Sequence, residues 1–261
     1  MTDFVRRPMH ATVTRVRDLS AHLRRVTLTG DQVDRFEYLA PDHLVRIFLP
    51  RDGVLELPDS EQWWPALQAI PEQRRPFCRN YTVRRIDHER RELDIDFVLH
   101  GDGGPASAWA LTVAPGDRIG VLSDGADYAP PADTTWQLLV ADETGLPAIT
   151  AALEALPAGM PAIALLEVDS PADEIPVRVP EGATLTWLHR AGTAPGTSDV
   201  VLRTAKELDL PDGTPYAFVA GESGMVTTVR RHLCRDRGVD KDRVYFCGYW
   251  KLATSLMETS S

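Results

Sequence analysis

Cysteine is scarce in this chain of 261 residues, and its three cysteines, Cys78, Cys234 and Cys247, are far apart. An odd number at such spacing makes neither a disulfide framework nor a zinc or iron–sulfur pattern. The seven histidines add no metal signal, because they do not cluster at ligand spacing. We therefore expect no resident metal site and a reducing compartment.

Basic residues are fewer than acidic ones: 28 Lys and Arg stand against 38 Asp and Glu, which gives a net charge of -10. This balance argues against general nucleic-acid binding, although it leaves room for a local basic pocket. No apolar run is long enough to span a bilayer, and the start of the chain lacks the apolar core of a signal peptide. We expect a cytoplasmic protein with no integral membrane segment and enough length for two domains.

The two halves of the chain differ in pattern. Short alternating segments at 11–17, 22–29, 44–50, 79–86, 92–99 and 118–122 predict strands, and with one helix they indicate a small antiparallel barrel. Beyond a linker at 125–135, strands are predicted at 136–141, 162–168, 185–189, 216–220 and 244–247. Helices predicted at 146–156, 198–208 and about 223–237 alternate with them, which favours a parallel sheet. The predicted domains are 1–130, an antiparallel β-barrel, and 131–261, an α/β domain.

The most informative strand reads Arg79-Asn80-Tyr81-Thr82-Val83-Arg84. Alternation places Arg79, Tyr81 and Val83 on one face and Asn80, Thr82 and Arg84 on the other. A guanidinium matches a phosphate, a Tyr ring can cover a flat heteroaromatic ring, and the Thr82 hydroxyl can bond to the edge of that ring.

A second strand and a helix start follow this motif. Leu93, Ile95, Phe97 and Leu99 alternate, and then Gly103-Gly104-Pro105-Ala106-Ser107 opens a helix whose free N–H groups attract a pyrophosphate. Together the segments predict a flavin dinucleotide cradle. The alternative is an ordinary hairpin with a charged, exposed face.

Polar residues also follow three strands of the predicted parallel sheet, where ligands usually bind. They are Asp142 and Thr144, Glu222, and Asp169, which is suited to a ribose 2′-hydroxyl. The Thr-Gly turn at 144–145 is not a Gly-x-Gly-x-x-Gly fingerprint. Thr144 and Ser223 have the alternative role of helix caps, and Asp169 that of a solvated loop residue.

Five segments together resemble the siderophore-interacting proteins, a flavin reductase family related to ferredoxin-NADP reductases. The segments are residues 79–84, 96–110, 142–148, 220–222 and 248–251, including His100-Gly101-Asp102-Gly103-Gly104-Pro105-Ala106-Ser107 and Gly248-Tyr249-Trp250.

The resemblance implies an FAD-binding barrel, an NAD(P)H domain and transfer of electrons through FAD to a ferric siderophore, with release of Fe(II) in the cytoplasm. It implies no catalytic acid or base, because the flavin carries the chemistry. Basic Arg46 and Lys251 would attract the anionic chelate. The residues expected at the cofactors are Arg79, Asn80, Tyr81, Thr82, Phe97, Val98, His100, Gly104, Pro105, Ala106, Ser107, Asp142, Thr144, Glu222, Tyr249 and Trp250.

Two departures from the family pattern affect the expected substrate. A basic turn is replaced by Ser123-Asp124-Gly125-Ala126, which loses a cation and gains an acid. The terminal Trp-Arg-x-Gly pattern becomes Trp250-Lys251-Leu252-Ala253, and lysine keeps the charge without the bidentate fork.

Several alternatives remain open at this point. A general flavin reductase or diaphorase would share the cradle, and a siderophore-binding protein without turnover would not need it. Asp169 favours NADH because a carboxylate repels a 2′-phosphate, but Arg190 or Arg178 could counter it. We expect a monomer.

Overall fold

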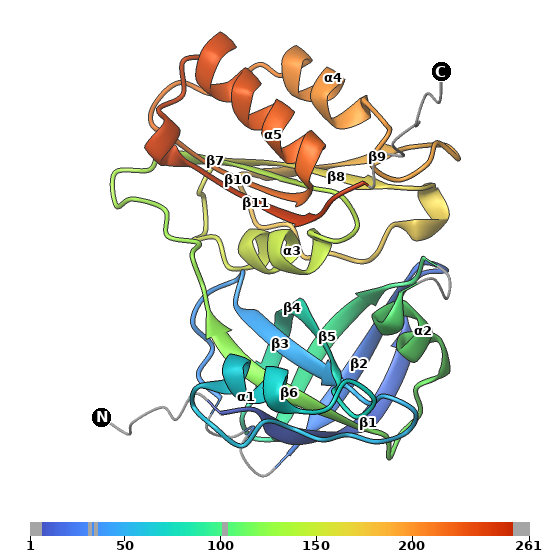
Figure 1. Ribbon diagram of the computed structural model, residues 1–261. Helices are drawn as coiled ribbons and strands as arrows, with labels where there is room; N and C mark the ends of the chain where they lie inside the picture. The colour runs from blue at the N-terminus through green and yellow to red at the C-terminus, as the bar shows by residue number, and fades with distance from the viewer. Residues whose placement is uncertain (1–6, 31–32, 34–35, 101–103, 253–261) are drawn as a thin grey trace, which may run out of the picture.

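The computed structural model describes residues 7–30, 33, 36–100 and 104–252, which form a β-barrel and a separate α/β layer (Figure 1). The barrel is closed and antiparallel, with the strand order β1-β2-β5-β4-β3-β6. Its strands are β1 (Met9–Asp18), β2 (Leu23–Thr29), β3 (Leu44–Leu49), β4 (Phe77–Asp87), β5 (Glu92–Val98) and β6 (Arg118–Gly125). The predicted barrel is thus confirmed, with several strands longer than expected.

The inward faces of these strands form one apolar core. Val45 and Ile47 of β3 meet Ile95 and Phe97 of β5 there, and Ala110 of helix α2 (Pro105–Thr112) closes one end. The alternation predicted for β4 holds from Arg79 to Val83, but a bulge between Val83 and Arg85 then shifts the register. Such a bulge re-aims the side chains that follow it.

The second layer is a five-stranded parallel sheet in the order β11-β10-β7-β8-β9. Helix α3 covers the face toward the barrel, and α4 and α5 cover the other face (Figure 1). The predicted parallel sheet and its three helices are therefore confirmed. The elements are β7 (Trp136–Ala141), α3 (Leu146–Glu154), β8 (Ala162–Val168), β9 (Ala183–His189), α4 (Val200–Glu207), β10 (Pro215–Glu222), α5 (Ser223–Arg231) and β11 (Val244–Trp250).

The helix predicted over about 223–237 ends in a different form. After α5, residues His232–Asp236 continue as a π-helical turn, η3. Short 3-10 turns are also formed at η2 (Pro171–Asp173) and η4 (Lys241–Arg243).

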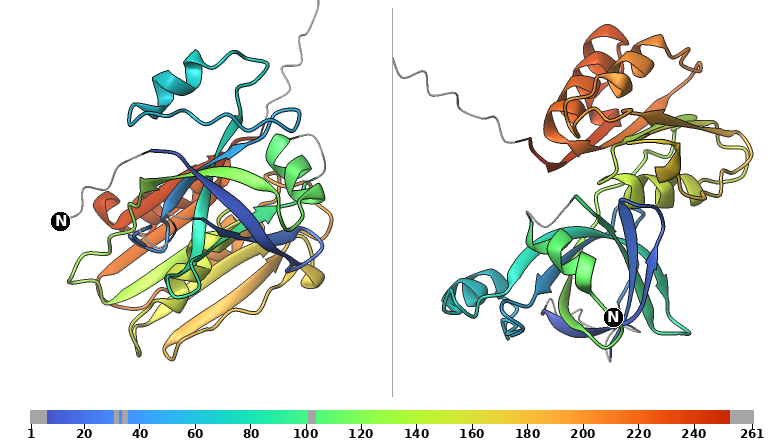
Figure 2. Two further views of the ribbon diagram at one scale, coloured as in Figure 1. Left: turned by 90° about the horizontal axis from the view of Figure 1, so that it is seen from below. Right: turned by 90° about the vertical axis from the view of Figure 1, so that its right-hand side faces the viewer.

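Helix α1 (Trp63–Ala69) was not predicted from the sequence. It has seven residues, contains a proline and has no side-chain cap, so local propensity is weak. Trp63 and Leu67 instead pack on Phe48, on the outer side of β3. Figure 2 shows the segment that carries α1 extending from the side of the barrel.

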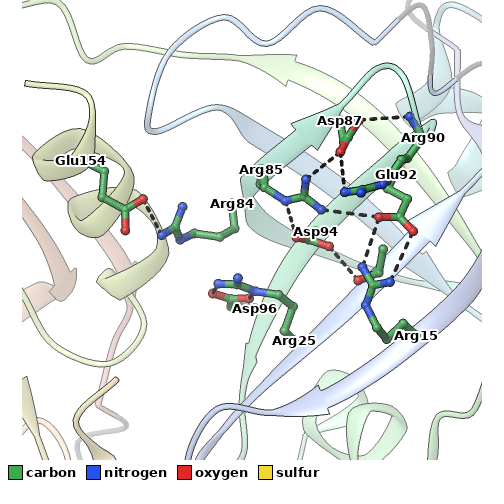
Figure 3. A network of polar contacts seen from close by, with 11 residues as sticks. Arg15, Arg25, Arg84, Arg85, Asp87, Arg90, Glu92, Asp94, Asp96 and Glu154 are labelled. Carbon is green, nitrogen blue, oxygen red and sulfur yellow. Dashed lines mark hydrogen bonds and ion pairs between the residues drawn. The ribbon is translucent and has the colours of Figure 1, made fainter. Parts of the chain in front are cut away.

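An ion pair joins the barrel to the α/β layer. Arg84 of β4 donates to Glu154 of α3 at 2.8 Å, and both side chains are largely covered (Figure 3). Behind it, a ladder of ion pairs crosses the barrel strands, with Arg25 on Asp96 at 2.6 Å and Arg85 on Asp94 at 2.9 Å. The barrel surface near the interface is thus held by paired charges.

Strand β6 ends at Gly125 and β7 begins at Trp136, so the boundary predicted at 130/131 lies between the two sheets. In the part of the chain that the structure describes, no helix combines the length and apolarity needed to cross a membrane.

Candidate functional site: a pocket between barrel and sheet

A cavity of about 270 Å³ lies where β4 of the barrel meets β11 of the parallel sheet. The two strands come from opposite halves of the chain, so the pocket exists only when both domains are folded. Residues lining it are Asp42, Leu44, Asn80, Tyr81, Thr82, Asp124, Gly125, Ala126, Asp127, Tyr245, Cys247, Gly248 and Tyr249. Of the expected site residues, Asn80, Tyr81, Thr82 and Tyr249 are therefore brought together.

An aromatic stack supports the barrel side of this pocket. The Tyr81 ring lies 4.5 Å from that of Phe97, which lies 5.4 Å from Trp109. Phe97 is fully buried inside the barrel, because its position on β5 points inward. The Phe97 side chain therefore supports Tyr81 from inside the barrel. Val98 is half-buried and packs against the apolar cluster on the α3 side of the sheet.

Thr82 and Tyr249 meet across the pocket. The Thr82 side chain is buried and hydrogen-bonds to the Tyr249 phenol, whose pKa is raised by burial. Side chains alternate along β11, so Tyr245, Cys247 and Tyr249 lie on the same side of the strand. Burial and the nearby Asp42 raise the pKa of the Tyr245 phenol, so both phenols remain neutral donors at ordinary pH.

The expected phosphate-binding residues lie at the start of α2 and on β4. Arg79 is exposed, and its guanidinium donates to the Cys78 carbonyl at 2.8 Å. Gly104 is the N-cap of α2 and Pro105 follows it. A Cβ on Gly104 would lie 3.2 Å from Cε1 of His100, so a side chain there would crowd that ring.

The junction before α2 is held by Ser107. Its Oγ accepts from the His100 amide at 3.1 Å, and Ser107 and Ala106 are both buried. The expected Gly101–Gly103 portion of this turn lies outside the described residues.

Asp142 connects three strand ends of the sheet. Its Oδ2 accepts from the Glu222 amide at 2.7 Å and from the Trp250 indole at 2.9 Å. Its Oδ1 accepts from the Thr144 amide and hydroxyl at 2.8 and 2.6 Å. Gly221 permits this approach, because φ is +143° there and a Cβ would lie 2.6 Å from the Asp142 Cγ. Thr144 thus supports Asp142 rather than capping α3.

Glu222 is the cap of α5. Its carboxylate accepts from the Gly224 and Met225 amides, the latter at 2.9 Å, and from the Leu252 amide at 3.1 Å. Partial burial opposes ionisation, but these hydrogen bonds and Lys251 hold the pKa of Glu222 below its ordinary value. The suggestion that Ser223 caps this helix is wrong, because its hydroxyl donates to the Trp250 carbonyl at 2.8 Å.

The structure pairs one of the two expected substrate-binding cations with an acid. Arg46 forms an ion pair with Asp124, donates to Asn80 at 2.9 Å and covers the Trp63 ring at 4.8 Å. Lys251 is exposed, and its charge acts on Glu222. The acid gained at position 124 therefore neutralises the cation at position 46.

Other lining residues were missed from the sequence. Asp42 and Asp127 lie in loops with no motif, so no local signal marks them. Tyr245 and Cys247 had a usable signal, because alternation along β11 places them on the same side as Tyr249.

At the other end of the sheet, Arg190 is buried among acids. It forms ion pairs with Glu143, with Glu167 at 3.9 Å and with Asp169 at 3.5 Å. Asp169 also accepts from the Gly192 amide at 3.2 Å. Arg178 donates to the Glu154 carbonyl. Both candidate counter-cations for a 2′-phosphate are therefore already engaged.

Family models match both parts of the chain. Residues 12–128 match the siderophore-interacting FAD-binding domain, and residues 134–253 match the siderophore-interacting protein domain. The chain belongs to the siderophore-interacting protein family, as the resemblance of its motifs indicated.

Individual relatives cover nearly the whole chain. Ferric vibriobactin reductase ViuB of Vibrio cholerae is 35% identical over 89% of this chain and 85% of its own length. The NADPH-dependent ferric-chelate reductase of Escherichia coli K12 is 32% identical over 92% and 91%. The crystal structure of a siderophore utilization protein from T. fusca superposes with a TM-score of 0.84 at 35% identity, covering 95% and 94%.

The residues at the pocket fit a flavin dinucleotide. A flat ring system with a polar edge suits a cavity bordered by the Tyr81 and Tyr249 rings, the Asn80 amide and the Thr82 hydroxyl. Exposed Arg79 and the N-terminus of α2 suit its pyrophosphate. Among the described residues, no group of three or more His, Cys, Asp and Glu side chains is placed to hold a metal ion.

Proposed function

We propose that this protein passes electrons from NAD(P)H through FAD to a ferric siderophore and releases Fe(II). The observation that supports this most is the pocket in which Tyr81 and Thr82 of the barrel face Tyr249 of the parallel sheet. A cofactor between the two domains would be within reach of a nucleotide on one side and a chelate on the other. The names of the V. cholerae and E. coli relatives fit the same reaction class.

The chain's own residues have holding and orienting tasks in this proposal. Arg79 and the start of α2 would hold the pyrophosphate, and Tyr81 and Tyr249 would border the ring system. Bound FAD supplies the chemistry, because it accepts a hydride and passes on single electrons. Asp142 and Glu222 would keep the strand ends that face the nicotinamide in register, through the hydrogen bonds described above.

The substrate's iron would be released because reduction weakens its binding. Hard oxygen donors hold Fe(III) far more strongly than Fe(II), whose affinity in such sites is ordinary for a divalent metal. The protein therefore needs no base or acid at the iron and no metal site of its own.

For the reductant we propose NADH over NADPH. Asp169 follows β8 at the edge where a ribose would lie, and Arg190 is already bound by three carboxylates. A 2′-phosphate would meet negative charge there. Steady-state kcat/KM for the two nucleotides, with one ferric chelate, tests this directly, and a preference for NADPH would contradict it.

We propose the cytoplasm as the location and a monomer as the working form. The reductant is a cytoplasmic metabolite, and all three cysteines are free thiols, which fits a reducing compartment. Light scattering on the FAD-loaded protein tests the monomer, and fractionation of cells tests the location.

A steady-state assay with a ferrous trap tests the reaction. The FAD-loaded protein, NADH and a ferric siderophore should produce trapped Fe(II), and protein freed of FAD should produce none. Rapid reduction of free flavin or quinone with no Fe(II) would instead identify a general flavin reductase. A protein that never takes up FAD but binds the chelate would be a siderophore-binding protein.

A further inference from the structure

We propose that the acidic charge around this pocket acts on a chelate that lies against the bound flavin, so that the site selects ferric chelates of zero or low negative charge, such as tris-hydroxamates, and disfavours highly anionic tris-catecholates. This inference names the substrate class of the site and therefore rests on the proposed function. It comes from the charges that surround the cavity.

The lining of the cavity is acidic. Asp42, Asp124 and Asp127 contribute to it, and none of the described residues that line it is Lys or Arg. Asp42 is buried, and its Oδ2 accepts from the Asp127 and Tyr128 amides at 2.9 and 3.0 Å. These bonds hold its carboxylate in place beside the pocket.

The cation beside the cavity is already matched by an acid. Arg46 donates to the lining residue Asn80 and is paired with Asp124, whereas Lys251 and Glu222 lie outside the lining. One cation against the three lining carboxylates Asp42, Asp124 and Asp127 leaves two negative charges. Arg79 does not change this balance, because the proposed function assigns it to the cofactor's phosphate.

The charge of a ferric chelate depends on its donor groups. Three hydroxamates each lose one proton and give a neutral Fe(III) complex, whereas three catecholates each lose two and give a trianion. A trianion that approaches this surplus negative charge is repelled, and a neutral complex is not. Repulsion between partly exposed charges is screened by salt, so the discrimination should be largest at low ionic strength.

Binding can be measured apart from electron transfer by replacing Fe(III) with Ga(III). The gallium complexes have the same charges, and NADH does not reduce them. We would titrate the FAD-loaded protein calorimetrically with a hexadentate gallium tris-hydroxamate and a hexadentate gallium tris-catecholate. The dissociation constant of the trianion should fall as salt is raised, and that of the neutral complex should stay constant.

Matched variants test the source of the effect. Asp124→Asn and Asp127→Asn should each tighten trianion binding by about three- to tenfold at low salt and leave the neutral complex within about twofold. Asp127 is exposed, so its variant tests the inference even if Asp124→Asn fails to fold. Glu207→Gln on α4, on the far face of the sheet, removes one charge away from the pocket and should change neither constant.

Two results would overturn the inference: trianion binding that weakens with salt, or variants at 124 and 127 that bind both complexes as the wild type does. Neither result bears on the proposed function, which fails separately if the FAD-loaded protein produces no Fe(II) from either ferric chelate.

Discussion

The Trp250 indole N–H donates to Oδ2 of Asp142 at 2.9 Å, although the two residues are 108 positions apart in the chain. Strand β10 lies between their strands in the sheet, and its last residue, Glu222, donates to the same oxygen through its amide. One carboxylate thus ties together the ends of β7, β10 and β11. These are the ends that face the proposed nicotinamide site.

Asp142→Asn should destabilise the protein more than Trp250→Phe does. The amide keeps one acceptor oxygen but turns an NH₂ group toward donors, so we expect a loss of about 2–4 kcal/mol in the free energy of unfolding. Trp250→Phe removes one of four hydrogen bonds and should cost about 1 kcal/mol. Urea unfolding of both variants gives the comparison, and equal losses would show that Asp142 does not connect the strands.

Tyr81→Ala should weaken FAD binding, whereas Tyr81→Phe should not. The ring, and not the hydroxyl, borders the pocket and rests on Phe97 at 4.5 Å. We expect a dissociation constant raised roughly ten- to hundredfold for the alanine variant and changed by less than about threefold for phenylalanine. Titration of flavin fluorescence measures both. Wild-type affinity in Tyr81→Ala would remove this strand from the proposed site.

The pair of Arg84 and Glu154 should couple the two domains measurably (Figure 3). A double-mutant cycle with alanine at each position should give a coupling energy of about 0.5–1.5 kcal/mol, because both side chains are largely covered. The exposed pair of Arg203 and Asp199, at 3.9 Å within α4, serves as the control and should give about zero. Equal coupling in the two pairs would show that burial at the interface adds nothing.

Glu167 should make the protein less stable as pH rises toward neutrality. Burial and the neighbouring Glu143 raise the pKa of Glu167 to about 7, with Arg190 opposing them. Between about pH 4.5 and pH 7 the folded state therefore keeps a proton that the unfolded state has lost. Stability declines over this window as pH rises, and the loss is complete once pH exceeds the folded-state pKa.

Glu167→Gln replaces the titrating carboxyl group with an amide that stays neutral at every pH of the test. Its stability relative to wild type should rise by about 2–3 kcal/mol between pH 5 and pH 8. Urea unfolding at the two pH values measures the difference. A difference between variant and wild type that does not change with pH would contradict the raised pKa.

Alternation and strand order made much of the architecture predictable. In strands such as β5, the alternation of Leu93, Ile95 and Phe97 predicts which side chains are buried in the barrel core. Asp142 and Glu222 could be expected to lie near one another, because the carboxyl ends of parallel strands share one edge.

The charge of the site could not be predicted in the same way. The pairing of Arg46 with Asp124 depends on β3 lying beside β6, and nothing local to either residue indicates the contact. Asp42 is buried, and its carboxylate accepts a hydrogen bond from the Tyr128 amide, 86 positions away in the chain. Helix α1 likewise depends on tertiary packing of Trp63 on Phe48. Such features arise from long-range contacts that a local pattern does not contain.

The most direct test of the proposed function is an anaerobic spectrum of the FAD-loaded protein through two additions. Adding NADH should bleach the flavin absorbance, and adding a ferric tris-hydroxamate with a ferrous trap should restore it while Fe(II) accumulates in a ratio of about two per flavin, since a hydride carries two electrons. Bleaching with no recovery after any ferric chelate would contradict the account, as would protein that does not bind FAD.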